Sequence, residues 1–496
     1  MSAPQRQVGS FSVPLWQILD VVVIGGGPAG ATIGRLLARW GRRVLILSRP
    51  PGRSRSLAEC LPPSTRKILR HVGILEEVDG AGFLRTSGNT VWWGDGDARV
   101  ETYGGVGYQV VRADLDRLLL DLAAQAGAEV RVAVARGAGL GEAPWVEAGA
   151  SAPLEARFLV DCSGRAGLVA RRGLRLLEPR LDTLAVLGVW ERPGGWGLQD
   201  ESHTLVETYE DGWAWSIPVT PDRRYFTVMI DPPARGRRLE QVYAAELAKT
   251  AHIGKLLEGA APVGNPWACE ASLYTASRFA GPGFLLVGDA GSFIDPLSSF
   301  GVKKALASAW AGAVVVNTCL SRPALAEAAL EFFSNRERQV WQSHRRLASR
   351  YYQEAAARYP SGFWKRRADA PVDPAPWHED EEALKRDPQV RAALATLQRG
   401  PGIRLRAGAD VRTEPRPAIS GRQVVLEPAV VAPGVPEGLR FLYGVDLPRL
   451  VEMAPRHRQA PDLFEAYNRT GAPVGLPEFL AALAALLAHG ILLPTP

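Results

Sequence analysis

The sequence predicts an α/β protein with a doubly wound parallel sheet and a second, antiparallel sheet. Apolar strand patterns alternate with helical patterns up to about residue 175, the order that a doubly wound sheet requires. Three apolar strands end in glycine-rich or acidic turns, at Gly25, Asp161 and Gly288. Residues 176–275 contain successive strand patterns that are typical of an antiparallel sheet.

The first strand, residues 20–24, runs into a G-x-G-x-x-G pattern and then a helical pattern. Gly25 permits a tight turn, Gly27 lets the backbone approach a pyrophosphate, and Gly30 allows close packing of helix on strand. A second apolar strand, residues 43–47, follows within about 30 residues, as a βαβ unit requires. The pattern therefore predicts a dinucleotide site.

The second strand does not end in the acidic residue that commonly holds the adenosine ribose. Ser48 and Arg49 stand there instead. The Ser48 hydroxyl can hydrogen-bond a ribose, but this departure leaves open which dinucleotide binds.

The last strand, residues 284–287, leads into Gly288, Asp289 and a helical pattern at residues 302–313. An aspartate at such a strand end can accept hydrogen bonds from a polyol, and the free N–H groups at the helix start face any nearby anion. A similar turn follows the strand at residues 158–161. The three turns, after residues 24, 161 and 287, are what one nucleotide site at the edge of a single parallel sheet requires.

Other segments carry a family resemblance. Residues 212–218 match the pattern W-x-W-x-I-P, and residues 59–64 and 107–116 are similar to segments of the same proteins. Over roughly residues 17–368 the chain resembles flavoprotein monooxygenases of the para-hydroxybenzoate hydroxylase fold, and among them the flavin-dependent halogenases. The resemblance implies a Rossmann-type FAD-binding domain and bound FAD.

The turns and the resemblance together assign a set of residues to FAD. These are Gly25, Gly27, Ala29, Gly30, Ser48, Arg49, Glu59, Arg112, Gly288, Asp289, Pro296, Ser299 and Gly301. Trp92, Trp213 and Trp215 fall on strands that the fold would place above the flavin, where flat rings can wall an aromatic pocket. An ordinary core role for these three tryptophans is the alternative.

One departure from the halogenases concerns residues 82–90, where their catalytic lysine falls on Thr86. Threonine has no amine to hold hypohalous acid, and the neighbouring Arg85 is one residue out of register and stays protonated. Direct oxygen transfer is therefore the favoured chemistry. The resemblance then implies that reduced FAD and O2 form a C4a-hydroperoxide, whose oxygen attacks an electron-rich aromatic ring.

Two residues are candidates for a catalytic role. Asp295 lies inside the predicted flavin motif and is the best carboxylate candidate near the reaction. The Lys303 ammonium could reach an anionic substrate or the flavin, although paired lysines commonly form a solvated face. The seven histidines and four cysteines show no metal-ligand spacing, so no metal is expected.

The expected domains are a first part of the FAD domain at residues 1–175, a substrate-binding sheet at 176–275 and a last part of the FAD domain at 276–367. A proline-rich linker at 368–379 leads to a small, mainly helical domain at 380–496. This domain ends in a helix, Gly490 and a short strand, in the order of a winged-helix module. A protein-recognition unit and a lid are both open interpretations.

A halogenase-like core without the lysine but with a C-terminal extension resembles flavoproteins that hydroxylate a tryptophan residue of another protein during quinone-cofactor maturation in amine dehydrogenases. The resemblance implies a tryptophan-containing polypeptide as substrate, with O2 and with NADH, NADPH or a separate flavin reductase as electron source. Halogenation of a phenol, pyrrole or indole is the first alternative. A noncatalytic assembly factor or a reductase is the second.

Composition fits a folded enzyme. The chain has 496 residues, 46% of them hydrophobic, and a formal net charge of +6 that is too modest to favour nucleic acid. No apolar run reaches the length that spans a bilayer, and no secretory leader is evident. We expect a cytoplasmic protein.

Overall fold

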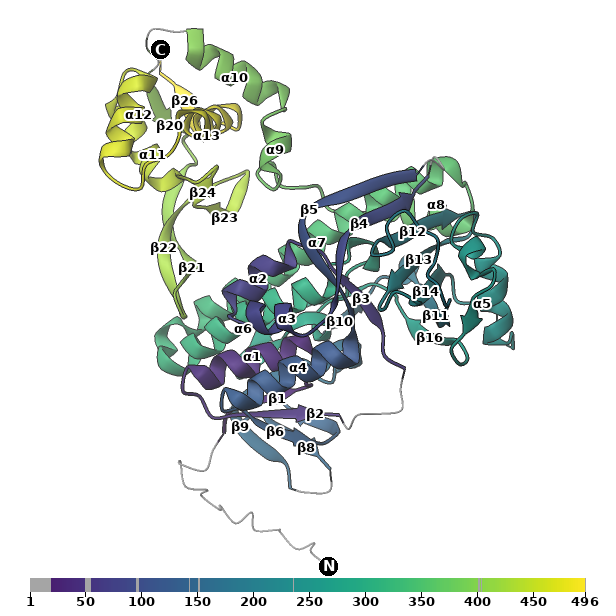
Figure 1. Ribbon diagram of the computed structural model, residues 1–496. Coiled ribbons are helices and arrows are strands. Elements are labelled where there is room, and N and C mark those ends of the chain that lie inside the picture. Colours follow the sequence, from purple (N-terminus) through teal and green to yellow (C-terminus); the bar gives the residue numbers. More distant parts are fainter. Residues whose placement is uncertain are drawn as a thin grey trace, which may run out of the picture. The chain divides into compact units, whose positions relative to one another are not determined.

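The chain divides into two compact units, Met1–Val372 and Asp373–Pro496 (Figure 1). This division falls inside the segment 368–379 that the sequence assigns to a linker. The computed structural model describes residues 19–49, 55–94, 98–141, 143–149, 152–234, 236–399, 402 and 404–495. No helix in these ranges is both long and apolar enough to cross a membrane.

A mainly parallel sheet forms the base of the N-terminal unit. Its strands, in spatial order, are β18 (Ala280–Gly281), β19 (Phe284–Leu286), β9 (Leu154–Asp161), β1 (Leu19–Ile24), β2 (Val44–Ser48) and β6 (Glu129–Val132). The strands from β19 to β6 run parallel, and the central residues of β1 and β2 are fully buried. The α/β fold class and its Rossmann-type sheet are confirmed.

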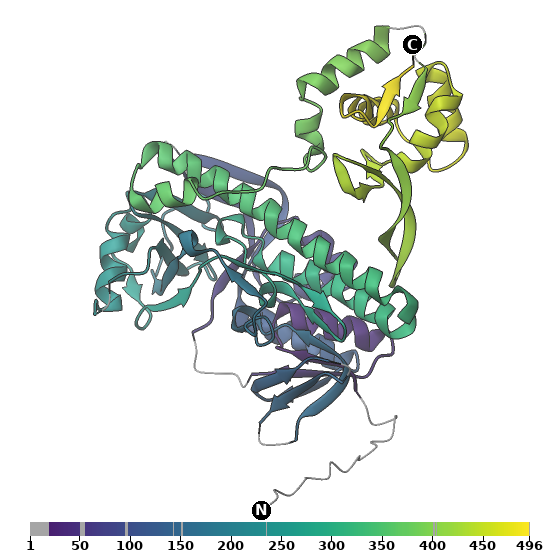
Figure 2. The ribbon, with the colours of Figure 1, turned by 180° about the vertical axis from the view of Figure 1, so that it is seen from behind.

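Three helices cover one face of this sheet (Figure 1): α1 (Pro28–Arg39), α4 (Arg112–Gln125) and α6 (Gly301–Ser321). Pro28 occupies the first turn of α1, where its missing N–H costs no hydrogen bond. α1 packs against both α4 and α6. The long α7 (Ala326–Arg358) then runs across the unit and is followed by α8 (Gly362–Ala368) (Figure 2).

The second sheet is larger than the block at 176–275 from which the sequence predicts it. Its path is β15 (Ala261–Pro262), β11 (Leu184–Glu191), β14 (Arg223–Ile230), β13 (Gly212–Pro218), β12 (Thr204–Tyr209), β4 (Leu84–Trp92), β5 (Ala98–Val111) and β3 (Ala58–Leu61), with β16 (Trp267–Glu270) also on β11. Strands β3, β4 and β5 come from the segment assigned to the first part of the FAD domain. These three strands are connected to the rest of the second sheet by the parallel pairing of β4 with β12.

The C-terminal unit combines helices with a β-hairpin. Its helices are α9 (Glu381–Leu384), α10 (Pro388–Arg399), α11 (Leu447–Met453), α12 (Ala460–Arg469) and α13 (Leu476–Ala488). The hairpin pairs β21 (Arg412–Ser420) with β22 (Gln423–Ala432), and β23 (Val435–Leu439) adds to β22. The Asp380 carboxylate accepts the N–H groups of Glu382 and Ala383 and so caps the start of α9.

Helix α13 is the centre of that unit's core. Phe479, Leu483 and Leu486 are fully buried and pack with residues from the other helices and from β22. Gly490 follows with a φ of 68°, and β26 (Leu492–Pro494) then pairs with β20 (Leu405–Ala407). The helix, glycine and short strand occur in the order that the sequence predicts.

Leu483→Ala should destabilise the C-terminal unit by about 2 to 5 kcal/mol, because it removes buried methyl groups and leaves a cavity. Urea denaturation followed by circular dichroism measures this loss. Leu476→Ala on the same helix is the matched control, since Leu476 is 48% exposed and its truncation should change little. Equal losses in the two variants would contradict the assignment of α13 as the core helix.

Candidate functional site

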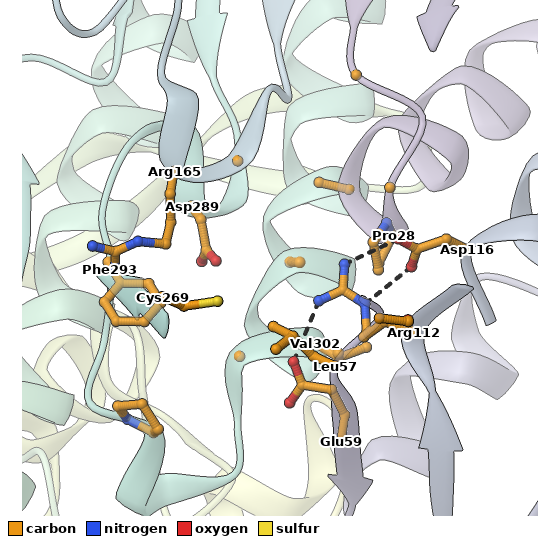
Figure 3. A pocket seen from close by; sticks show the side chains of 18 of the residues that line it. Pro28, Leu57, Glu59, Arg112, Asp116, Arg165, Cys269, Asp289, Phe293 and Val302 are labelled. Carbon is orange, nitrogen blue, oxygen red and sulfur yellow. Dashed lines mark hydrogen bonds and ion pairs between the residues drawn. The ribbon is translucent and has the colours of Figure 1, made fainter. Parts of the chain in front are cut away.

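A cavity of about 850 Å³ lies in the N-terminal unit between the two sheets (Figure 3). The ends of the parallel strands contribute Ile24, Ser48, Cys162 and Val287. Because the carboxyl ends of parallel strands meet at one sheet edge, this is where an open α/β sheet binds its ligand. Strands β11, β12, β13 and β14 form another part of the wall.

The glycine-rich turn lines the cavity and leaves room for a ligand at one position. Gly25 has a φ of 111°, and a Cβ there would lie 2.3 Å from the Cys162 carbonyl oxygen. A Cβ on Gly30 would lie 1.8 Å from the Gly25 carbonyl oxygen. At Gly27, by contrast, a Cβ would meet nothing closer than 3.7 Å. Gly27 is the N-cap of α1 and no side chain caps that helix, so its first N–H groups are available to an anion.

Arg112 stands beside Gly27 on this side of the cavity (Figure 3). Its Nε and Nη2 donate to the two carboxylate oxygens of Asp116 at 3.0 and 3.2 Å, and its Nη1 donates to Glu59 Oε1 at 3.3 Å. Burial alone would lower the pKa of Arg112, but the two carboxylates raise it above its ordinary value. A fixed guanidinium beside a helix N-terminus suits a diphosphate.

Asp289 lies on the opposite side, at the end of β19 (Figure 3). Its Oδ1 atom is buried and has no hydrogen-bond partner among the described residues. A buried carboxylate oxygen that accepts no hydrogen bond is costly, so this atom fits a ligand that brings a hydroxyl group. Gly27, Arg112 and Asp289 together match the diphosphate and the sugar-alcohol chain of a flavin dinucleotide.

The segment that follows, Asp295 to the start of α6, also borders the cavity. The Asp295 carboxylate accepts the Leu297 N–H at 3.0 Å through Oδ1 and the Tyr352 hydroxyl through Oδ2. Burial raises the pKa of Asp295. Oδ2 therefore fixes the loop to α7, while Oδ1 caps the short turn that follows Asp295. The role of Asp295 as a catalytic carboxylate stays a prediction. Ser299 in this loop has a φ of 51°, which is rare for a residue other than glycine.

The wall formed by β11 to β14 carries no charged side chain among the described residues that line the cavity. Trp213 and Trp215 lie on β13 with ring centroids 4.9 Å apart. Aliphatic side chains such as Leu187 and Val206 surround them, and Thr204 adds a hydroxyl. This wall is suited to a flat, uncharged ring.

The structure does not bring Trp92 or Lys303 to the cavity. Trp92 on β4 is paired with Glu207 on β12, and Glu207 is paired with Ala214 on β13. Paired residues lie on the same face of a sheet, so Trp92 lies on the face of Ala214 and not on that of Trp213. There its ring stacks on His252 at 4.4 Å. The Lys303 ammonium donates to Ser64 Oγ at 3.1 Å and is outside the described lining of the cavity.

The remaining predicted FAD residues all line the cavity, except Gly30 and Gly288, which shape its turns. Residues that sequence reasoning missed include Asp116 and three cysteines. Asp116 could have been found, because it lies four residues after Arg112 on a helix. Burial raises the pKa of the Cys60 thiol to about 11 and also raises the pKa values of Cys162 and Cys269.

Thr86 is 2% exposed in β4, and its hydroxyl donates to the Gly88 carbonyl oxygen at 3.2 Å. It lies outside the described lining of the cavity, and no lysine occurs in that lining. No group of three or more histidine, cysteine or acidic residues in the described ranges could hold a metal ion.

A family model described as an FAD binding domain matches residues 18–351. The chain belongs to this FAD-binding family. Its resemblance to the flavin-dependent monooxygenase and halogenase superfamily, predicted from the sequence, is thereby confirmed. FAD fits three features of this structure: the open space at Gly27, the Arg112 guanidinium, and the Asp289 oxygen that accepts no hydrogen bond from the described residues.

Among curated relatives, a tryptophan 2-halogenase of Chondromyces crocatus is 29% identical over 368 residues, which are 69% of each chain. The flavin-dependent halogenase armH3 of Armillaria mellea is 30% identical over 359 residues, 64% of this chain and 71% of the relative. These names favour the halogenase alternative over the hydroxylase prediction.

Two solved structures cover nearly the whole chain. The flavin-dependent halogenase CmlS superposes with a TM-score of 0.78 at 21% identity, over 96% of each chain, and shows the fold. The peptidyl tryptophan dihydroxylase QhpG, described as essential for tryptophylquinone cofactor biogenesis, superposes with a TM-score of 0.69 at 26% identity, over 95% of this chain and 99% of its own.

Gly27→Val should weaken FAD binding at least tenfold, or about 1.4 kcal/mol, because its methyl groups would extend into the space of the diphosphate. The fold should survive, since a Cβ fits there and the φ of −75° suits any residue. FAD titration of the apoprotein measures the effect. Gly104→Val is the control, on an exposed strand position with nothing within 4 Å of the new Cβ. Unchanged affinity in Gly27→Val would contradict the placement of the diphosphate.

Proposed function

We propose that this protein is an FAD-dependent monooxygenase that hydroxylates an indole ring, in the form of a tryptophan residue within a partner polypeptide. The observation that carries the proposal is the cavity lining, which in the described ranges includes no lysine. In the halogenases that the sequence resembles, a catalytic lysine stands at the position of Thr86. Without an amine to hold hypohalous acid, transfer of oxygen itself is the chemistry that remains.

Different residues of the chain would bind different parts of FAD. The turn at Gly27 and the Arg112 guanidinium would hold the diphosphate of FAD, and Asp289 would accept hydrogen bonds from its hydroxyl groups. When bound, FAD supplies activated oxygen from O2, with electrons from NADH, NADPH or a separate flavin reductase. The uncapped N-terminus of α6, which follows the Asp295 loop, would stabilise negative charge on the ring system of FAD.

The uncharged wall supports an indole and indicates how it is presented. Trp213 and Trp215 can orient a flat ring, and the aliphatic residues around them exclude water from the reacting carbon. Free tryptophan also carries an ammonium and a carboxylate, which are costly to bury without charged partners. A tryptophan within a polypeptide carries neither at its α-carbon. The likeness to QhpG along 95% of the chain supports a peptidyl substrate.

Halogenation is the second candidate, because the curated relatives above are halogenases. It requires a residue that captures hypohalous acid and directs it to the ring. A noncatalytic assembly factor is the third candidate, and it requires only that FAD be bound. The three candidates differ in their products, so one experiment separates them.

We expect the purified protein, supplied with O2 and with NADH, NADPH or a flavin reductase, to add one or two oxygen atoms to a tryptophan-containing polypeptide. Intact-mass and fragment spectra locate the oxygen on the indole, and a polypeptide with phenylalanine in place of that tryptophan is the control. Addition of bromide should leave the product unchanged. A brominated product would establish the halogenase, and bound FAD without any product on peptidyl or free indoles would favour the assembly factor.

Thr86→Lys should gain bromide-dependent bromination of an indole, because it restores an amine at the position where the halogenases have one. The variant will be less stable than the wild type, since Thr86 is almost fully buried. Thr86→Met is the matched control, as it fills a similar volume without an amine. If the lysine variant bound FAD but made no brominated product, the residue at position 86 would not be what separates the two chemistries.

A further inference from the structure

Lys304 is a buried lysine directly behind the turn at residues 288–292, called the flavin turn below. It lies in the first turn of α6 and is 4% exposed. Its Nζ donates to the Gly288 carbonyl oxygen at 3.1 Å and to the Ser292 carbonyl oxygen, and it lies 3.6 Å from Asp289 Oδ1. Lys304 thus closes the turn at residues 288–292 from behind, on the side away from the cavity lining.

One carboxylate lies close enough to balance the charge of the Lys304 ammonium. A buried ammonium is costly unless an opposite charge lies close to it. Among the described residues, Asp289 is the carboxylate within ion-pair distance of Lys304. The attraction between the two charges holds the Asp289 carboxylate at the position from which it lines the cavity.

Other side chains hold the backbone groups of this turn, whereas Lys304 lies within ion-pair distance of the Asp289 carboxylate. Ser308, one helical turn further along α6, accepts the Gly288 N–H at 3.0 Å. The Tyr274 hydroxyl donates to the Asp289 carbonyl oxygen at 2.6 Å. Gly288 itself has a φ of 65°, which favours glycine. Asp289 Oδ1 has no hydrogen bond from any of these groups.

We propose that Lys304 is a positioning residue for FAD, which holds the Asp289 carboxylate in place and aimed at the hydroxyl groups of the cofactor. This role rests on FAD binding alone and holds for a monooxygenase and a halogenase alike. It also separates Lys304 from its neighbour. Lys303 is the residue before Lys304, so its side chain leaves α6 in a different direction. Its ammonium contacts Ser64 and the ring of Phe300 instead.

The test is an FAD titration of apoprotein, followed by the quenching of flavin fluorescence. Lys304→Met should raise the Kd for FAD by about tenfold or more, the scale of a lost interaction with a charged group. Lys303→Met is the matched control and should leave the Kd for FAD unchanged. An unchanged Kd in Lys304→Met would overturn the proposal.

Lys304→Gln isolates the charge from the hydrogen bonds. Its amide can still donate to carbonyl oxygens of the turn, so it should fold even if Lys304→Met does not, while the positive charge is lost. We expect nearly the same rise in Kd as for Lys304→Met. Wild-type affinity in folded Lys304→Gln would show that the charge of Lys304 does not act on Asp289, and would overturn the proposal.

A double-mutant cycle separates positioning from a general contribution to the fold. Asp289→Asn removes the partner charge, so in that background Lys304→Gln should change the Kd for FAD by less than about threefold. Effects of the two substitutions that add in full would mean that Lys304 supports the fold without acting through Asp289. The melting temperature of each apoprotein, measured in parallel, records that structural contribution.

Discussion

The close approach of β1, α1 and β9 at their ends is the constraint on which the site depends. Gly25 lies against the Cys162 carbonyl oxygen, and Gly30 lies against the carbonyl oxygen of Gly25 itself, with no space for a side chain at either position. This contact lets α1 begin directly at the sheet edge, with its uncapped N-terminus toward the cavity. A side chain at Gly25 or Gly30 would move the helix and with it the place where a diphosphate can bind.

Around that edge, the cavity has regions of different chemistry. The flavin side carries charges that are already matched within the protein, as Arg112 is with Glu59 and Asp116. The wall of β11 to β14 carries none in its described lining. A cofactor with a diphosphate and an uncharged aromatic ring can therefore share one cavity, each against the surface that suits it.

Local patterns were sufficient to predict the parallel strands, the glycine turn and the acidic strand end, because glycines and apolar runs act over a few residues. Long-range pairing was not predictable in this way. The addition of β4 to β12 extends the second sheet with strands from a distant segment, and the same register turns Trp92 toward His252 while Trp213 faces the cavity. On α6, the adjacent residues Lys303 and Lys304 point in different directions, and only Lys304 is buried. Sequence alone did not show which of the two lysines faces the flavin turn.

Three of the four cysteines, Cys60, Cys162 and Cys269, line the cavity in which FAD would activate oxygen. The thiolate is the form of cysteine that oxidants attack, and burial raises the pKa of each of these thiols. Burial therefore favours the protonated form of these thiols. In the proposed monooxygenase, these thiols would react slowly with an oxidising species formed between the cavity walls, so the burial that excludes water would also slow self-inactivation.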